Sequence, residues 1–244
     1  MHLLLYTLAA VICCTTPSFA TDEVRTETEQ LPTAGAKERL RIKGWTIHLN
    51  SELRQTEPEK TRQMLELLDV QLDRVVKTVP PNALESLRTV PIWINPQYEG
   101  VRPSAEYHPG AGWLRDNGRD PAMVKAVEIT NVSNFAFENR RMPYVMLHEL
   151  AHAYHDQVLG FDEPAVIAAF EAARESGGYE EVRRFNGRKT VIDRAYALSN
   201  HKEYFAESTE AYFGKNDFYP FNRAELKVHD SQMHDLLKKL WQVE

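Results

Sequence analysis

Residues 142–160 read MPYVMLHELAHAYHDQVLG, and this segment decides which fold and which chemistry we expect. Pro143 suits the first turn of a helix and Gly160 suits the position just past its end, so a helix is predicted over roughly 143–159. The apolar residues of this helix leave little room for a solvated face, which predicts that the helix is buried. They are Val145, Met146, Leu147, Leu150 and Ala151.

Polar residues are embedded in that apolar helix in the pattern HExxH. His148 and His152 are four residues apart, so their side chains lie on one helical face and can bind one metal ion. Glu149 is placed to take a proton from a water molecule on that ion. The alternative is a helix whose histidines only pack or cap, but buried polar side chains are costly without a task. We therefore predict a zinc site with His148 and His152 as ligands and Glu149 as the catalytic base.

A catalytic zinc ion needs a third protein ligand and one open position. His155 lies on the same face, but it is seven residues from His148, about 10 Å along the helix axis, which is too far to share the ion. His155 is instead expected at the rim of the cleft, behind the ligands or in solvent. His108, in a predicted loop, is a second candidate for lining the cleft.

A later segment, residues 200–214 (NHKEYFAESTEAYFG), offers a carboxylate ligand. Glu203 and Glu207 are four residues apart and share one helical face, so the first could bind the metal and the second could accept a hydrogen bond from a ligating histidine. The two glutamates could also form a solvated face, but interleaved aromatic residues indicate that this helix packs against the first. The aromatic residues are Tyr204, Phe205, Tyr212 and Phe213.

HELAH followed by EYFAE resembles the glutamate-zincins, and the second motif is closest to that of the lethal-factor-like metallopeptidase domains. The likeness covers about 143–213. It implies that Glu203 binds zinc and that Glu207 supports a ligating histidine. It also implies that Tyr196, seven residues before Glu203, stabilises the oxyanion of the tetrahedral intermediate. The chain lacks the large accessory domains of the toxin, so the resemblance implies nothing about targets.

Together these motifs predict a secreted zinc metallopeptidase that hydrolyses peptide bonds in a protein or peptide substrate. Two alternatives stay open: a catalytically inactive zinc-binding module, and a zinc hydrolase of a non-protein amide such as a cell-wall crosslink. The presence of both Glu149 and Tyr196 argues against the inactive module. Nothing in the sequence separates the peptidase from the other hydrolase.

The order of predicted elements, strands first and helices later, indicates an α+β fold. The resemblance implies a zincin-like single domain with a small twisted sheet, the active-site helix and C-terminal helices. In such domains the edge strand binds the substrate backbone, and residues 126–132 (AVEITNV) are the candidate for that edge. Further strands are predicted over 40–49, with a bulge at Gly44, and over 88–95. Further helices are predicted over 60–79, 163–176, 200–213 and 223–241.

The first residues have the character of a secretory signal. Residues 1–20 are an apolar run that ends in Ser18-Phe19-Ala20, which predicts cleavage after Ala20. Residues 21–37 are expected to be a flexible leader before the domain at 38–244. Cys13 and Cys14 both lie in the signal, so histidines and carboxylates must bind any metal in the mature chain.

Charge and hydropathy exclude two classes of partner. The net charge is -6 and no basic stripe is present, which argues against a nucleic-acid surface. The apolar run at the start is too short for a comfortable membrane span, so no integral membrane anchor is expected. We expect a monomer that is secreted or periplasmic.

Overall fold

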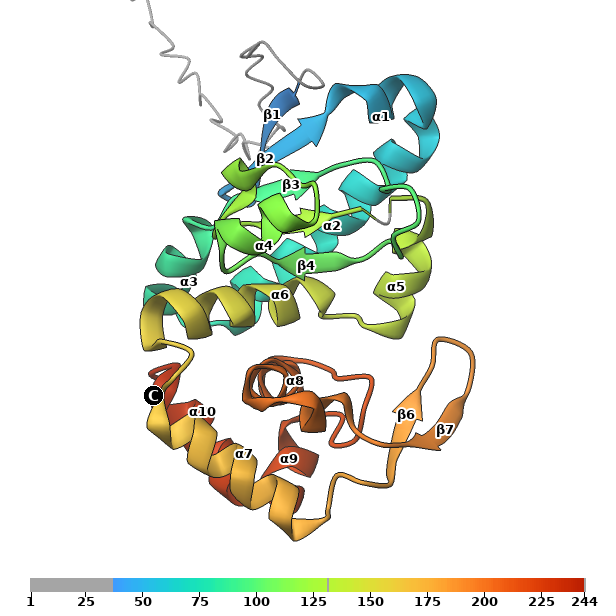
Figure 1. The fold of residues 1–244 in the computed structure, drawn as a ribbon. Helices are drawn as coiled ribbons and strands as arrows, with labels where there is room; N and C mark the ends of the chain where they lie inside the picture. Colours follow the sequence, from blue (N-terminus) through green and yellow to red (C-terminus); the bar gives the residue numbers. More distant parts are fainter. Residues whose placement is uncertain (1–36, 131, 244) are drawn as a thin grey trace, which may run out of the picture.

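The computed structural model describes residues 37–130 and 132–243 (Figure 1). The predicted signal over 1–20 and nearly all of the predicted leader over 21–37 lie outside the described residues. In the described part the chain has an α+β fold around a five-stranded mixed sheet, as the order of elements predicts. None of the helices described between residues 37 and 243 is long and apolar enough to cross a membrane.

The sheet begins with a β-hairpin, so the prediction of one bulged strand over 40–49 is wrong. β1 (Lys37–Ile42) and β2 (Trp45–Asn50) pair antiparallel. The two residues between them, Lys43 and Gly44, have φ values of 50° and 97°. Positive φ at both central positions is what a two-residue hairpin turn requires. Gly44 therefore lies in a turn that reverses the chain, where the sequence predicted a bulge within one strand.

The other strands are short, and one of them was not predicted. The strand order is β1-β2-β3-β5-β4, where β3 (Ile92–Ile94) and β5 (Val127–Ile129) run parallel to β2. β4 (Ala105–Tyr107) pairs antiparallel with β5 and forms the edge of the sheet. The strand predicted over 126–132 is present as β5, but it lies inside the sheet, so its assignment to the edge is wrong. The edge belongs to a segment expected to be loop.

Two predicted helices pack on the sheet. α2 (Pro58–Thr78) corresponds to the helix predicted over 60–79, and α6 (Val145–Tyr154) to the one over 143–159. α6 continues as a π-helical turn over His155–Leu159. Fully buried side chains of the sheet, α2 and α6 form one core; they include Ile47, Leu49, Ile92, Ile94, Val127, Ile129, Leu68, Leu72, Val75, Met146, Leu147 and Leu150.

The second half of the chain is mainly helical. α7 (Pro164–Ser176) and α8 (His201–Phe213) confirm the helices predicted over 163–176 and 200–213. The single helix predicted over 223–241 is two helices, α9 (Arg223–His229) and α10 (Ser231–Leu240). They part at Asp230, whose carboxylate accepts a hydrogen bond from the Met233 N–H and thereby begins α10.

Several short elements were not predicted from the sequence. Between α7 and α8 lies a second hairpin, which consists of β6 (Val182–Phe185) and β7 (Thr190–Asp193). The described part also contains short 3₁₀ turns and four short α-helices: α1 (Ser51–Thr56), α3 (Pro81–Arg88), α4 (Ala111–Asp116) and α5 (Phe135–Arg141).

The two halves of the molecule meet where α6 faces α8 (Figure 1). Two glycines allow the halves to approach closely. A Cβ on Gly214, just after α8, would overlap the Tyr144 ring just before α6. A Cβ on Gly187, in the β6–β7 turn, would lie 2.6 Å from Cζ of Phe137 in α5. These contacts fix the separation of the elements that carry the predicted site.

Candidate metal centre and active site

α6 and α8 bring two histidines and one glutamate to a single point. His148 Nε2 lies 3.1 Å from Glu203 Oε2 and 3.2 Å from His152 Nε2, and His152 Nε2 lies 3.2 Å from Glu203 Oε2. The three predicted ligands therefore form a nearly equilateral triangle. Asn200 caps α8 by accepting hydrogen bonds from the N–H groups of Lys202 and Glu203. This places Glu203 in the first turn, where the helix dipole favours a carboxylate.

The triangle fits a tetrahedral zinc ion. Zinc binds nitrogen and oxygen at about 2.0–2.2 Å, so two ligands of one tetrahedral ion lie roughly 3.3–3.5 Å apart. The observed separations of 3.1 to 3.2 Å differ from this by only a few tenths of an ångström. Two imidazoles and one carboxylate are also a donor set known for catalytic zinc. His148, His152 and Glu203 are thus able to hold the ion.

A glutamate that the sequence did not single out orients His148. His148 Nδ1 donates a hydrogen bond to Oε1 of Glu210 at 2.8 Å. The expected acceptor was Glu207, but its Oε1 lies 3.9 Å from that nitrogen, too far for a good hydrogen bond. The hydrogen bond predicted for Glu207 is therefore made by Glu210. Because Nδ1 donates a hydrogen bond to Glu210, Nε2 is the nitrogen of His148 that can bind a metal once it has lost its proton.

Buried carboxylates lie behind the ligands. Glu207 accepts a hydrogen bond from Asn216 Nδ2 at 3.0 Å, and Asp217 pairs with Arg141 at 2.7 Å. Burial, followed by the charge of Asp217, raises the pKa of Glu207 well above its usual range. Burial also raises the pKa of Glu210, to about 7, against the opposing effect of His148.

The neighbouring polar groups shift the pKa values of His148 and Glu203. Burial alone would lower the pKa of His148, but its hydrogen bonds with Glu203 and Glu210 raise that pKa well above the usual range. Burial would raise the pKa of Glu203, yet its hydrogen bonds with the two histidines hold it well below the usual range. Without a metal the site therefore holds protons on His148 and on buried carboxylates, and a divalent cation would displace them.

Glu149 is buried beside the triangle and is held by the edge strand. The backbone N–H of Tyr107 in β4 donates a hydrogen bond to Glu149 Oε2 at 2.9 Å. Burial is the main cause that raises the pKa of Glu149 to about 8. A divalent cation between His148, His152 and Glu203 would lower that pKa again, since a nearby positive charge favours the carboxylate.

Tyr196 opens the short 3₁₀ turn Tyr196–Ser199 that leads into α8. Its side chain is 48% exposed and lines the same cavity as the triangle and Glu149. Burial of its other half, together with the charge of Glu203, raises the pKa of Tyr196. The phenol therefore stays protonated at neutral pH and can donate a hydrogen bond.

The cavity over the triangle has a volume of about 450 Å³. One wall comes from β4 and from α5, and the other comes from α8, from β6 and from Asp217 and Phe218 after α8. All three expected ligands, Glu149 and Tyr196 line it. The cavity can therefore bring a substrate against the expected metal site and the edge strand at the same time.

The two other histidines expected at the cleft lie elsewhere. His155 is fully buried, with its ring 5.2 Å from that of Phe161 and 4.7 Å from that of Phe205. His108 is also buried, and its Nε2 lies 2.9 Å from Glu128 Oε2. Neither side chain lines the cavity. The cleft roles considered for His155 and His108 are therefore wrong.

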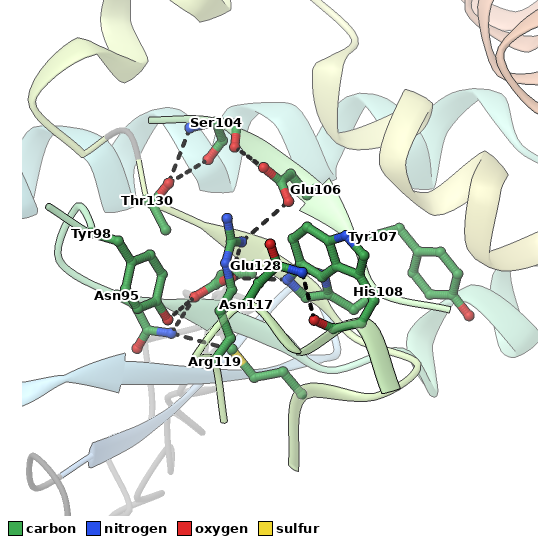
Figure 2. Close-up of polar contacts among 12 residues, drawn as sticks. Asn95, Tyr98, Ser104, Glu106, Tyr107, His108, Asn117, Arg119, Glu128 and Thr130 are labelled. Atoms are coloured by element: carbon green, nitrogen blue, oxygen red, sulfur yellow. Dashed lines mark hydrogen bonds and ion pairs between the residues drawn. The ribbon is translucent and has the colours of Figure 1, made fainter. Parts of the chain in front are cut away.

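His108 instead belongs to a buried polar network under the edge strand (Figure 2). Its centre is the carboxylate of Glu128 in β5, which is 1% exposed. The pKa of Glu128 is lowered to about 2, because hydrogen bonds with His108, Asn95 and Tyr98 outweigh the effect of burial. The atoms that contact Glu128 are Asn95 Nδ2 at 2.7 Å, Tyr98 Oη at 2.7 Å, His108 Nε2 at 2.9 Å and Arg119 Nη1 at 2.8 Å.

The network fixes β4 next to the expected metal site. Arg119 contacts both Glu128 and Glu106, at 2.8 and 3.2 Å (Figure 2). Glu106 and His108, the two neighbours of Tyr107 in the chain, are therefore both held by the pair of Glu128 and Arg119. Between them, the Tyr107 N–H donates its hydrogen bond to Glu149. No periodic pattern predicts this strand, because it is only three residues long.

Comparison with family models, with curated proteins and with solved structures finds no match, so the residues of the site are what indicates its chemistry.

Proposed function

We propose that this chain is a zinc metallopeptidase of the glutamate-zincin type, which hydrolyses peptide bonds in a protein or peptide substrate. The observation that carries the proposal is the triangle of His148, His152 and Glu203 with Glu149 beside it on the same helix as the two histidines. The predicted signal supports a secreted or periplasmic protein.

Zinc held by these residues would polarise the scissile carbonyl and acidify a water molecule. Glu149 would take a proton from the attacking water and later deliver it to the nitrogen of the leaving amine. The second donor to the carbonyl oxygen is Tyr196, whose hydroxyl stabilises the negative charge that develops there in the transition state. The exposed half of the Tyr196 side chain faces the cavity in which the substrate would lie.

The edge strand supports a peptide substrate over other amides. In an antiparallel pair, backbone groups alternate between the two sides of the strand. The backbone groups of Ser104 and His108 make hydrogen bonds with the segment around β5. By the alternation, the backbone groups of Ala105 and Tyr107 point away from β5. Glu149 accepts the Tyr107 N–H, which leaves the Tyr107 carbonyl and both backbone groups of Ala105 for a ligand. An extended peptide can therefore add to β4 as a further strand while its scissile bond lies at the expected metal site.

Metal analysis and one substitution test the proposal. Protein purified without added metal should contain one zinc per chain, and Glu149→Gln should keep that zinc but lose hydrolysis of a broad peptide library. Removal of zinc by a chelator should abolish the wild-type activity, and zinc should restore it. Zinc binding with no hydrolysis would favour the inactive module, and hydrolysis of cell-wall crosslinks alone would favour the other hydrolase. A protein without zinc would contradict the proposal.

A further inference from the structure

Three arginines line one end of the cavity. Arg102 lies just before β4, Arg141 ends α5 and Arg184 lies in β6. β4 and α5 belong to the upper half of the molecule in Figure 1, and β6 belongs to the lower half. Arginines from both walls therefore line the same cavity, and guanidinium groups are the side chains that best bind carboxylates.

Arg141 is committed mainly to carboxylates of the protein. Its guanidinium donates two hydrogen bonds to Glu138, at 3.0 and 2.7 Å, and one to Asp217 at 2.7 Å. The side chain is only 18% exposed. Arg141 is thus a structural residue that joins α5 to the segment after α8.

Arg184 is only partly occupied. Its Nη1 donates a hydrogen bond to Asp193 at 2.8 Å, and its guanidinium lies 4.5 Å from the centre of the Phe218 ring. Its Nε lies 3.6 Å from Asp217 and makes no hydrogen bond to any residue that the structure describes. Arg184 is therefore held in place, and since its unpaired Nε is buried, only the exposed part of its side chain, 30% of it, can meet a ligand.

Arg102 is exposed, and among residues 37–130 and 132–243 it has no hydrogen bond, ion pair or ring contact. Each carboxylate of the cavity lining has another partner in the described structure, and none contacts Arg102. The partners are Arg119 for Glu106, Arg141 for Glu138 and Asp217, the Tyr107 N–H for Glu149, the two ligating histidines for Glu203 and Asn216 for Glu207. Arg102 is thus the arginine of the cavity lining whose guanidinium has no partner among the described residues.

We propose that Arg102, assisted by Arg184, binds a carboxylate of the peptide substrate and so directs cleavage to peptides with an acidic group on one side of the scissile bond. This inference rests on the proposed function. Arg102 precedes Ala105 by three residues, so a peptide that extends along β4 passes it a few residues from the metal site. The carboxylate can come from an Asp or Glu side chain or from the free C-terminus of the peptide.

Binding to zinc-loaded Glu149→Gln protein tests the inference without turnover. The probes are short alanine-rich fluorescent peptides that carry one Glu at each position in turn, each matched by the same peptide with Gln. Every peptide is made with a free and with an amidated C-terminus. At the favoured position we expect Glu to bind about 3- to 10-fold more tightly than Gln, with a difference that shrinks at high salt. A difference that requires the free C-terminus would assign the site to the terminal carboxylate.

Substitutions assign the effect to the arginines. Adding Arg102→Gln should bring the Glu and Gln peptides to nearly equal affinity, and Arg102→Glu should favour a Lys-containing peptide instead. Arg184→Gln should reduce the preference in part. Arg115→Gln, at an exposed arginine of α4 outside the cavity, is the matched control and should leave the preference unchanged.

Equal affinity of the Glu and Gln peptides, a preference that survives Arg102→Gln, or no peptide binding at all would each overturn the inference. The proposed function is judged separately with the wild-type protein. Hydrolysis without an acidic preference would contradict only the carboxylate site. Preferential binding of acidic peptides with no hydrolysis by the zinc-loaded wild type would contradict only the peptidase.

Discussion

His148 Nδ1 lies 2.8 Å from Glu210 Oε1, and this pair connects the HExxH helix to the third turn of α8. Glu210 is 0% exposed, so its carboxylate makes this bond in a dry environment where it is strong. The bond fixes both the ring orientation and the tautomer of His148. The zinc affinity we propose should therefore depend on Glu210 as well as on the three ligands.

Glu210→Ala should weaken zinc binding by about 10- to 100-fold, because loss of the acceptor frees the His148 ring to rotate. Glu207→Ala removes an equally buried carboxylate that lies 3.9 Å from the same nitrogen, and it should weaken zinc much less. Competition with a chromophoric chelator gives both dissociation constants, and circular dichroism verifies the fold. The reverse order of the two variants would return the support role to Glu207.

Tyr196→Phe should retain zinc and lower kcat by about 10²- to 10³-fold, since it removes a hydrogen-bond donor to the developing oxyanion. KM should change little if the hydroxyl acts mainly in the transition state. Steady-state kinetics on a peptide from the library test measure both constants. An unchanged kcat would show that Tyr196 only lines the cavity.

Gly214→Ala should destabilise the protein by about 1–3 kcal/mol, because its Cβ would overlap the Tyr144 ring and force α8 away from α6. Zinc affinity should fall with it, as the two helices carry the ligands. Thermal unfolding with and without zinc measures both effects. Gly112→Ala is the control: no atom lies within 4 Å of its added Cβ, and it should be neutral or slightly stabilising.

His155 should make the protein sensitive to acid. Burial, followed by the charge of His201, lowers the pKa of His155 from 6.5 to about 3. Between these values the unfolded chain binds a proton that the folded chain does not bind. Above about pH 6.5 the burial of His155 therefore costs no stability through protonation. As the pH decreases from there toward 3, the free energy of unfolding falls by at most about 1.4 kcal/mol per pH unit.

His155→Leu should reduce this loss, since an apolar side chain suits the contacts with Phe161 and Phe205. Urea unfolding of both proteins at several pH values in the presence of a chelator measures the difference and excludes the effect of zinc release. Parallel curves for the two proteins would contradict a neutral buried His155.

That His148, His152 and Glu203 lie together could be predicted, because helical spacing and motif order are local properties of the sequence. The choice between Glu207 and Glu210 could not be made that way, although helix geometry offered a hint. At about 100° per residue, Glu210 lies about 20° from the direction of Glu203, whereas Glu207 lies about 40° away. Both glutamates share a face with Glu203, so the packing of α8 against α6 decides which one reaches His148.

The edge strand β4 and the burial of His108 could not be predicted from the sequence. β4 has three residues, too few for a recognisable alternation, and its place depends on the contact of Arg119 with Glu106 and Glu128. His108 was considered for the cleft because a loop histidine gives no sign of its burial. Such residues are positioned by partners distant in the chain, which no local pattern reveals.

The short edge strand also has a consequence for self-association. An open strand edge can pair with the same edge of another copy and lead to aggregation. β4 is flanked by Pro103 and Pro109, which lack the N–H needed to extend a ladder. At the opposite edge, β1 presents the exposed charged residues Arg39 and Arg41. Neither edge thus offers the long, uncharged ladder on which fibrils grow, while β4 keeps the few backbone groups that the proposed peptide substrate would use.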